Sequence, residues 1–429
     1  MEVLQDTYKD SKIGRIPKEW VVVKLKDINE DSLLGGNYKN GEGEKGIPLI
    51  KMGNLDRGKI KLNKIQNIPE TLVYDNIHIL KEGDFLFNTR NTLELVGKVA
   101  IWRNELPKAL YNSNLLKIDF NKSKVHSTKF MNYVFNSDLV IKKLRGLATG
   151  STSVAAIYNK DLFKLKVPLP PVREQQKIAA ILSTVDEQIS TTDKIIEKSK
   201  ELKKGLMQKL FSEGIGHTEF KDSKIGRIPK CWKLRILKDC CEKINVGFVG
   251  TCEKYYCSKE DGVLLLRTGN LNKGKLKMET MRYVLSEFND KNTKSQLFPG
   301  DIIIARHGDS GQAVIIPEDF EKSNCLNIII IRSKNENYPL YIKYLINSPA
   351  IVKQVKQRTA GSTQKVINTG AVAKLKIPIA SKLEQQKIAA ILSEADAKIE
   401  KEQTQKTQLE ALKKGLMQQL LTGKKRVKV

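Results

Sequence analysis

The feature that most constrains this chain is an internal duplication: three blocks of its sequence occur twice, in the same order. The blocks are residues 10–18 and 222–230 (DSKIGRIPK), residues 174–183 and 384–393 (EQQKIAAILS), and residues 203–208 and 413–418 (KKGLMQ). The two copies are offset by 210 to 212 residues. Identities of this length at a nearly constant offset do not arise by chance, so we expect the chain to fold as two related halves.

Between the shared blocks the two copies have diverged. Residues 20–170 and 232–380 each contain short runs rich in β-branched and aromatic residues, separated by Gly, Asn and Asp, which is the pattern of strands and turns. A helix is expected in each, near residues 129–144 and 340–357. The chain is therefore predicted to carry two different domains of mixed α and β structure on a common frame.

Each EQQKIAAILS block opens a long segment whose apolar residues recur at alternating steps of four and three, as in the seam of a coiled coil. In the first copy the seam comprises Ile178, Leu182, Val185, Ile189, Thr192 and Ile196, and after a phase shift it continues with Leu202, Leu206 and Leu210. In the second copy it comprises Ile388, Leu392, Ala395 and Ile399, and then Leu409, Leu412, Leu416 and Leu420. Gly214 and Gly423 stand just past the two segments, where helices commonly end. We expect the two helices to pack antiparallel. The alternative, in which each helix packs only on its own domain, stays open.

These patterns divide the chain into five parts. They are a first domain (1–171), a first helix (172–212), a second domain (213–381), a second helix (382–421) and a basic tail (422–429). The predicted fold class is α+β, with two pseudo-two-fold-related mixed α/β domains separated by two long helices that form an antiparallel coiled coil.

The chain carries a formal net charge of +27. Such an excess destabilises a compact fold by self-repulsion, so we expect a polyanionic partner, most simply nucleic acid. A basic surface that is merely solvated is the alternative. No apolar run approaches the roughly 20 residues of a membrane span, and the opening MEVLQDTYKD lacks the apolar core of a signal peptide. We therefore expect a cytoplasmic protein without membrane contact. Its six cysteines are expected to be free thiols.

Basic residues and small polar loops follow the expected helix of each domain. Residues 341–380 contain seven Lys or Arg and no Asp or Glu. Backbone amides and hydroxyls of such loops can hold phosphates, and neighbouring cations add counterion release. The candidate DNA-contacting residues are Lys142, Lys143, Arg145, Thr149, Ser151, Thr152 and Ser153 in the first copy, and Lys353, Lys356, Arg358, Ser362, Thr363, Gln364 and Lys365 in the second. Arg90 and Arg306 are further candidates, for contacts to base edges.

Motifs of catalysis are missing from the sequence. It has no G-x-x-x-x-G-K-[ST] loop for nucleotide phosphates, no Asn- or Asp-Pro-Pro-aromatic motif of amino-methyltransferases, and no metal spacing among its four histidines. Catalysis by this chain alone is not expected. Two other functions stay open: a self-sufficient basic nuclease without recognisable motifs, and a stand-alone bivalent architectural DNA-binding protein.

Across its whole length the chain resembles the specificity subunit of type I restriction-modification systems. The resemblance rests on three motifs. They are I-G-x-I-P-x-x-W at residues 13–20 and 225–232, L-P-P-x-x-E-Q-Q-K-I-A-A-I-L at residues 169–182, and K-K-G-L-M-Q in both copies. The second helix entry departs from the motif, because residues 379–384 read I-A-S-K-L-E where the family often keeps Pro-Pro.

The resemblance implies a non-catalytic subunit with two target-recognition domains, each reading half of a bipartite site in double-stranded DNA, and with helices that set the spacing. It also implies assembly with two modification (methyltransferase) subunits and with restriction (translocase-nuclease) subunits. S-adenosylmethionine, ATP and Mg²⁺ would be bound by those partners and not by this chain. We expect the partners to dock on the helices around Gln175, Gln176, Gln385 and Gln386.

Overall fold

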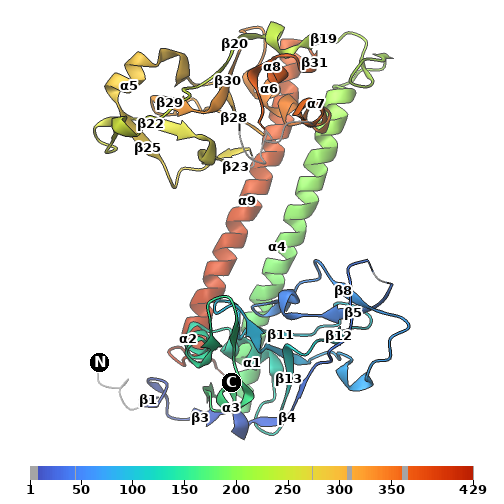
Figure 1. The fold of residues 1–429 in the computed structure, drawn as a ribbon, viewed down its shortest axis with the longest axis vertical. Helices are drawn as coiled ribbons and strands as arrows, with labels where there is room; N and C mark the ends of the chain where they lie inside the picture. The colour runs from blue at the N-terminus through green and yellow to red at the C-terminus, as the bar shows by residue number, and fades with distance from the viewer. Residues whose placement is uncertain (1–7, 44, 273, 307–311, 360–365, 429) are drawn as a thin grey trace. The chain divides into compact units, whose positions relative to one another are not determined.

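The computed structural model describes residues 8–43, 45–272, 274–306, 312–359 and 366–428. It comprises two compact units (Figure 1). Unit 1 contains Met1–Asp193 and Thr404–Val429, and unit 2 contains Lys194–Gln403. Each unit therefore holds one domain of mixed structure together with one half of each long helix.

The two long helices extend over the ranges that the periodicity predicts. Helix α4 covers Val172–Ser212 and helix α9 covers Lys382–Leu420. Just beyond them, Gly214 and Gly423 have φ angles of +65° and +70°. Glycine takes up this left-handed conformation without steric cost, so it lets the chain turn away from the helix end.

Unit 1 is built on a four-stranded antiparallel sheet and a smaller three-stranded sheet. The first has the order β11 (Val99–Ile101), β9 (Phe85–Asn88), β13 (Leu115–Phe120) and β4 (Asn29–Leu34), and the second the order β12 (Leu110–Tyr111), β5 (Gly46–Ile50) and β8 (Gln66–Pro69). Shorter pairings join β1 (Tyr8–Lys9) to β2 (Ile16–Pro17), β3 (Val21–Lys24) to β16 (Lys166–Leu169), and β6 (Leu55–Asp56) to β7 (Lys59–Ile60). The domain's helices are α1 (Thr128–Phe135), α2 (Asp138–Leu147) and the short α3 (Asn159–Leu162).

Unit 2 repeats this plan with different details. A four-stranded antiparallel sheet has the order β20 (Cys241–Val246), β30 (Ile328–Ser333), β27 (Ile302–Ala305) and β28 (Ala313–Ile315). A five-stranded sheet has the order β21 (Tyr256–Cys257), β25 (Arg282–Leu285), β22 (Gly262–Arg267), β29 (Ser323–Leu326) and β26 (Gln296–Leu297). The short pairs are β17 (Phe220–Lys221) with β18 (Ile228–Pro229), β19 (Lys233–Ile236) with β31 (Lys376–Ile379), and β23 (Leu271–Asn272) with β24 (Lys275–Leu276). Its helices are α5 (Ser286–Lys291), α6 (Pro339–Ile346), α7 (Pro349–Thr359) and α8 (Thr369–Ala373).

The long helices belong to the core of each domain. In unit 1, Ile178 and Leu182 of α4 and Leu420 of α9 lie in one apolar cluster with Trp20. In unit 2 the corresponding cluster joins Phe211 of α4 and Ile388 and Leu392 of α9 to Trp232. A domain and its helix ends are therefore stabilised by the same buried apolar surface.

Within unit 1 the two helices run antiparallel. Asp186 of α4 forms an ion pair with Lys413 of α9 at 2.7 Å. Asp193, seven residues later in α4, pairs with Lys406, seven residues earlier in α9, at the same distance. In unit 2, Lys203 of α4 pairs with Asp396 of α9. The predicted fold class of mixed α/β domains with two long antiparallel helices is confirmed.

Most of the predicted seam is buried or half-buried, but two positions are not. The Leu202 side chain is 62% exposed, and its counterpart Leu412 is 50% exposed. Beyond Ile196 the buried side of α4 widens to Met207 and Phe211, which pack with the predicted Leu210 in the core of unit 2. The helix here packs on a domain and not only on another helix, so the heptad spacing no longer marks its buried face.

An equivalent polar network fastens the helices to the domain in each unit. In unit 1 the Tyr133 hydroxyl donates to Asp186 at 2.7 Å, and Lys413 pairs with the same carboxylate. In unit 2 the matching residues are Tyr344, Asp396 and Lys203, and the tyrosine hydroxyl donates at 2.8 Å.

Unit 2 adds a second cation to this network. The Lys343 ammonium lies 3.8 Å from Asp396, where unit 1 has Asn132. Burial lowers the pKa of Lys343 to about 8, although the attraction of Asp396 opposes the shift. Burial disfavours the charged form of an amine, and the neighbouring Lys203 adds to the effect.

In the part of the chain that the structure describes, no helix combines the length and hydropathy required to cross a membrane.

Candidate nucleic-acid interface

In unit 1 the structure brings Arg90 and the polar loop at 149–153 together. A three-stranded sheet has the order β10 (Arg90–Asn91), β15 (Ala155–Ala156) and β14 (Thr149–Gly150). Arg90 and Thr149 both pair with Ala156, one on either side. Two residues that are 59 positions apart in the chain thus lie two strands apart on one small sheet, with exposed side chains.

The loop is a hairpin with its own hydrogen bonds. The Ser151 amide donates to the Val154 carbonyl at 2.9 Å, and the Ser151 hydroxyl accepts from the Val154 amide. Gly150 has a φ of +120°, and a Cβ there would lie 2.3 Å from the Val154 carbonyl oxygen. The tight turn therefore requires glycine, and it presents the side chains of Thr152 and Ser153 to solvent.

The basic residues of α2 lie next to this hairpin. Lys142 and Arg145 are exposed, and Lys143 is half-buried. Burial lowers the pKa of Arg57, and the nearby Arg145 lowers it further. One Nη atom of Arg57 is buried and has no hydrogen-bond partner in the described residues. An anion that binds beside two such cations stabilises them, because it offsets their mutual repulsion and the cost of their burial.

Lys143 belongs to a second cationic group of four lysines, and the sequence analysis did not identify the other three as site residues. Lys24 of β3 lies directly opposite Lys166 of β16. The nearby Lys12 and then desolvation lower the pKa of Lys166, and Lys166 in turn contributes to the lowered pKa of Lys143. Within the described residues none of the four forms an ion pair with an acidic side chain. Like charges opposite one another in a sheet are unfavourable, so a polyanion would stabilise this edge.

In unit 2 the matching face is partly described. Lys353 and Lys356 are exposed on α7. The Arg306 carbonyl accepts from the Ile367 amide at 2.9 Å, which places Arg306 beside the end of the second polar loop. Arg358 lies in the last turn of the same helix, but its side chain is not described. The remaining predicted residues, Ser362, Thr363, Gln364 and Lys365, lie outside the described residues.

The two faces differ at one aligned position. Lys143 of α2 corresponds to Gln354 of α7. The Gln354 side chain donates to the Lys376 carbonyl at 2.9 Å and accepts from the Lys376 amide at 3.1 Å. Unit 2 thus fixes its helix to the strand with a neutral amide, where unit 1 places a lysine.

Two of the four predicted partner-docking residues are not available on the surface. Gln175 and Gln385 are each only 1% exposed. The Gln175 amide donates to the Pro170 carbonyl at 2.9 Å, and Gln385 makes the same bond to Ala380. These residues secure the start of each long helix, and their side chains are buried in this structure. Gln176 and Gln386 are exposed.

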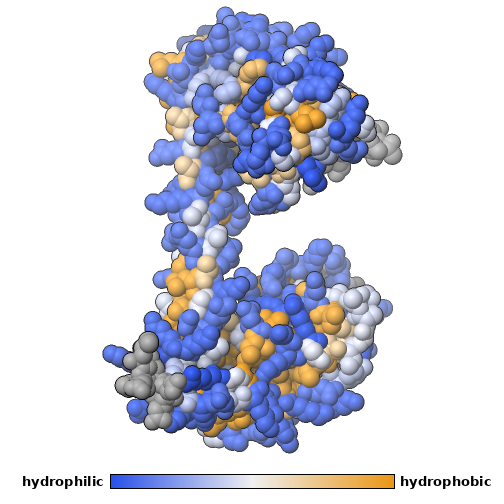
Figure 2. Space-filling model, turned by 90° about the vertical axis from the view of Figure 1, so that its left-hand side faces the viewer, coloured by the Kyte–Doolittle hydropathy of each residue, from blue (hydrophilic) through white to orange (hydrophobic). Residues whose placement is uncertain are grey.

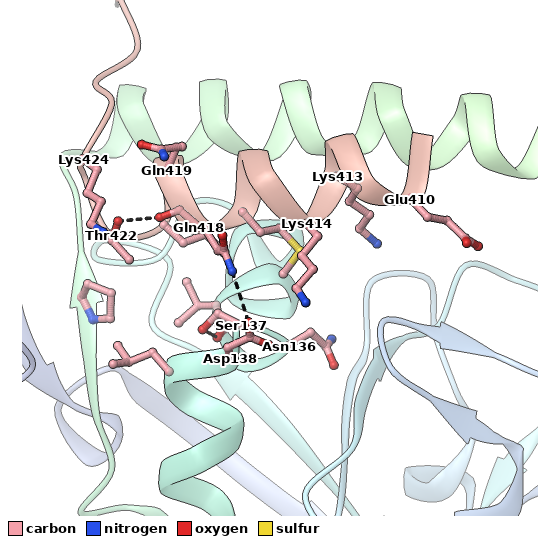
Figure 3. A pocket seen from close by; sticks show the side chains of 15 residues that line it. Asn136, Ser137, Asp138, Glu410, Lys413, Lys414, Gln418, Gln419, Thr422 and Lys424 are labelled. Carbon is pink, nitrogen blue, oxygen red and sulfur yellow. Dashed lines mark hydrogen bonds between the residues drawn. The ribbon is translucent and has the colours of Figure 1, made fainter. Parts of the chain in front are cut away.

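Each long helix ends over an apolar groove, and the two grooves have equivalent linings. In unit 1 a groove of about 510 Å³ lies between the last turns of α9 and the junction of α1 with α2 (Figure 3). Gln418 donates to Asp138 at its edge. In unit 2 a groove of about 310 Å³ lies between the end of α4 and the junction of α6 with α7. The equivalent lining pairs are Val134 and Leu345, Leu139 and Ala350, Pro168 and Pro378, and Met417 and Met207.

Most of the surface seen in Figure 2 is hydrophilic, with small apolar patches. Among the described residues, no group of three His, Cys, Asp or Glu side chains has the arrangement of a metal site. The six cysteines are free thiols, and Cys231 is exposed.

Comparison with known proteins places these features in context. The family described as "Type I restriction modification DNA specificity domain" matches the chain twice, over residues 17–201 and 229–411. The chain is 31% identical to the putative type I restriction enzyme MjaX specificity subunit of Methanocaldococcus jannaschii, over 99% of this chain and 98% of that protein. It is 30% identical to the MjaVIII specificity subunit of the same organism, over 99% and 97% of the two chains.

Two solved structures share the fold. The S subunit of the type I restriction-modification system from M. genitalium superposes with a TM-score of 0.56 at 15% identity, and the match covers 94% of this chain and 96% of that one. A chain from a structure of type I R-M complex assembly and conformational transition gives a TM-score of 0.55 at 15% identity, over 95% and 99%.

Proposed function

Because the chain belongs to the family of type I restriction-modification DNA specificity domains, we propose that it reads a bipartite site in double-stranded DNA, one half-site with each domain. The observation that carries the proposal is the duplication itself. An identical frame is repeated, while the domains that it holds have different sheets and different residues beside α2 and α7. Two unlike half-sites require two unlike readers.

The basic faces supply the contacts to the DNA backbone. Lys142 and Arg145 of α2 occupy the positions of Lys353 and Lys356 of α7, so each domain presents two cations at the same place. Phosphate contacts of this kind fix a protein on the duplex without selecting sequence. Selection by base edges is assigned to the divergent loops and to Arg90 and Arg306, because their surroundings differ between the units.

The long helices set the distance between the half-sites. Their ends are built into the domain cores, so a change in helix length moves a whole reading domain and not a flexible linker. Lengthening both helices equally should change the tolerated gap between the half-sites and leave their sequences unchanged. A changed half-site at a constant gap would contradict this role.

Two modification subunits are proposed to dock at the two apolar grooves, and restriction subunits to join them. Equivalent grooves lined by the repeated KKGLMQ blocks fit two copies of one partner. The partners would bind S-adenosylmethionine, ATP and Mg²⁺, and this chain would be non-catalytic. Leu139→Glu or Ala350→Glu should reduce the bound modification subunits from two to one, measured by native mass spectrometry, and the double variant should bind none. Two bound subunits in the double variant would exclude the grooves.

The decisive experiment maps methylated bases in the genome of cells that express the full chain with its modification subunit. The wild type should give a bipartite motif with a constant gap. A chain in which residues 20–170 also replace residues 232–380 should give a motif in which the first half-site occurs twice, in inverted orientation. A contiguous motif, or an unchanged motif in the hybrid, would contradict the proposal. DNA cleavage by the purified chain alone would favour a nuclease instead.

A further inference from the structure

The start of each long helix carries a glutamate, buried in unit 1 and half-buried in unit 2, that accepts a hydrogen bond from the repeated tryptophan. In unit 1, Trp20 Nε1 donates to Glu174 at 2.9 Å. In unit 2, Trp232 Nε1 donates to Glu384 at the same distance. The other partners of the glutamate differ. We name Glu19, Glu174 and Arg426 the unit 1 clasp, and Cys231, Glu384 and His217 the unit 2 clasp.

In the unit 1 clasp the chain end supplies a guanidinium. Arg426 donates through Nε and Nη2 to Glu174 at 2.7 and 3.0 Å, and through Nη2 to Glu19. These hydrogen bonds raise the pKa of Arg426 above its usual range. A permanently charged group thus joins two carboxylates.

In the unit 2 clasp the segment after α4 supplies an imidazole. His217 Nε2 lies 2.8 Å from Glu384 Oε1, and His217 Nδ1 lies 3.7 Å from Cys231 Sγ. A Cβ on Gly214 would lie 2.6 Å from the Glu384 carboxylate and 2.8 Å from the Trp232 ring, so the close passage of this segment requires glycine. The cysteine occupies the position of Glu19.

The hydrogen-bond partners of Glu384 determine which nitrogen of the neutral His217 imidazole carries the proton. Glu384 accepts hydrogen bonds also from the Ile215 amide and from Trp232, so it remains an acceptor toward His217. The proton therefore lies on Nε2, and Nδ1 faces the thiol as an acceptor. A thiol, an imidazole and an orienting carboxylate in this order form the constellation that activates a cysteine nucleophile.

The thiol is accessible to small reagents. Cys231 is exposed and borders a groove of about 420 Å³. Glu219 and Lys230, which pair with each other at 3.2 Å, line the same groove. The other thiols differ, because Cys240, Cys241, Cys252 and Cys325 are buried and Cys257 is half-buried. Burial raises the pKa of Cys241 to about 12 and raises those of Cys240, Cys257 and Cys325.

We propose that Cys231 is a modification site that forms a mixed disulfide with small-molecule disulfides, with His217 accepting the thiol proton and Glu384 positioning His217. The thiolate sulfur attacks one sulfur of the reagent, the reagent's S–S bond breaks, and one equivalent of thiolate leaves. The proton moves from Cys231 Sγ to His217 Nδ1. No net oxidant is needed beyond the disulfide itself. The site does not depend on the proposed DNA recognition.

The test is the reaction of the native full chain with the aromatic disulfide dithiobis(nitrobenzoate), followed by release of the coloured thiolate and by peptide mass spectrometry. We expect one fast phase of one thiol per chain, located at Cys231. It should be absent in Cys231→Ser and present in the matched control Cys257→Ser. His217→Gln keeps a donor toward Glu384 but removes the acceptor at Nδ1, and it should slow the fast phase by about tenfold or more at pH 7.

The role of His217 as proton acceptor also predicts a signature in the pH–rate profile. The wild-type rate at Cys231 should show a step that is absent in His217→Gln, whereas the far-UV circular dichroism of the two proteins stays the same. Rates within about twofold of each other would overturn the proposal. A second measurement needs no variant: native Cys231 should react faster than the same thiol in urea-unfolded chain at the same pH. An equal or slower native rate would also overturn it.

Discussion

The two clasps hold equivalent helix ends with different chemistry. In unit 1 the partner of the buried glutamate comes from the C-terminal tail, through Arg426, and in unit 2 it comes from the segment between the copies, through His217. The acceptor is part of the repeated frame, while the donor comes from whichever segment follows a long helix. The two copies therefore share the glutamate acceptor but differ in the residue that donates to it.

This difference has an energetic consequence. Glu174 is 1% exposed and forms an ion pair with a guanidinium that cannot lose its charge. Glu384 accepts instead from an indole, a backbone amide and an imidazole. Removal of Glu174 leaves the partly buried guanidinium of Arg426 with Glu19 as its one remaining carboxylate among the described contacts, whereas removal of Glu384 leaves an indole, a backbone amide and an imidazole without this acceptor.

The largest expected effect is the loss of the buried carboxylate. Glu174→Leu should lower the free energy of unfolding by about 3–5 kcal/mol, because the Trp20 indole loses its acceptor and Arg426 loses two of its three hydrogen bonds to carboxylates. Glu384→Leu should cost about 1–3 kcal/mol. Urea unfolding followed by hydrogen exchange in β3 and in β19 would report the two units separately. Equal losses would show that the charge of Arg426 contributes nothing beyond a hydrogen bond.

The basic faces of the two units should contribute equally to DNA affinity. Removing two phosphate contacts should reduce the slope of log K against log salt by about 1.8. We expect this from Lys142→Ala with Arg145→Ala and, separately, from Lys353→Ala with Lys356→Ala, measured by fluorescence anisotropy. Lys401→Ala, on an exposed position of α9, is the control. A reduction from one pair alone would show that only one domain binds the duplex.

Local periodicity predicted the long helices because both their ends and most of their seam depend on neighbours within a few turns. It failed at Leu202, where the helix packs in the core of unit 2, and at Leu412, which is half exposed. The burial of Gln175 could not be read from sequence either, because the partners of its amide are backbone carbonyls, which sequence does not display.

The cationic edge of unit 1 could not be found from sequence for a related reason. Lys24 and Lys166 are 142 positions apart, and only the register of β3 with β16 places them opposite each other. Arg426 was recognisable only as part of a basic tail. Its role depends on the return of the chain end to Glu174, and the repeat pattern would have suggested this only by alignment of the tail with the segment that holds His217.

The polar networks that fasten the long helices to the domains predict a difference between the two units in how stability depends on pH. Between the folded pKa of Lys343, about 8, and its ordinary value of 10.5, the unfolded chain holds a proton that unit 2 has released. The free energy of unfolding should therefore rise with pH in this window, by about 1 kcal/mol per unit. Lys343→Asn, which copies Asn132 of unit 1, should remove this rise, and Asn132→Lys should create one in unit 1.

Urea unfolding at pH 7, 8 and 9 checks this expectation through the difference between wild type and variant. The difference is needed because the buried thiols act in the opposite direction: their pKa values are raised in the folded state, so they oppose stability once the unfolded thiols ionise near pH 9. An unchanged slope in Lys343→Asn would mean that the amine stays protonated in the folded unit through its contact with Asp396.

The smallest expected change in stability comes from exchanging the clasps. Cys231→Glu with His217→Arg installs the unit 1 groups in unit 2, where Glu384 and the tryptophan are already in place. The new guanidinium replaces the imidazole as a hydrogen-bond donor to Glu384 at a partly exposed site. The free energy of unfolding should therefore change by less than about 1 kcal/mol. A large loss would mean that the segment after α4 cannot carry a guanidinium to the position that Arg426 reaches from the tail. Each clasp would then depend on the conformation of the segment that supplies its donor, and not only on the glutamate that both units share.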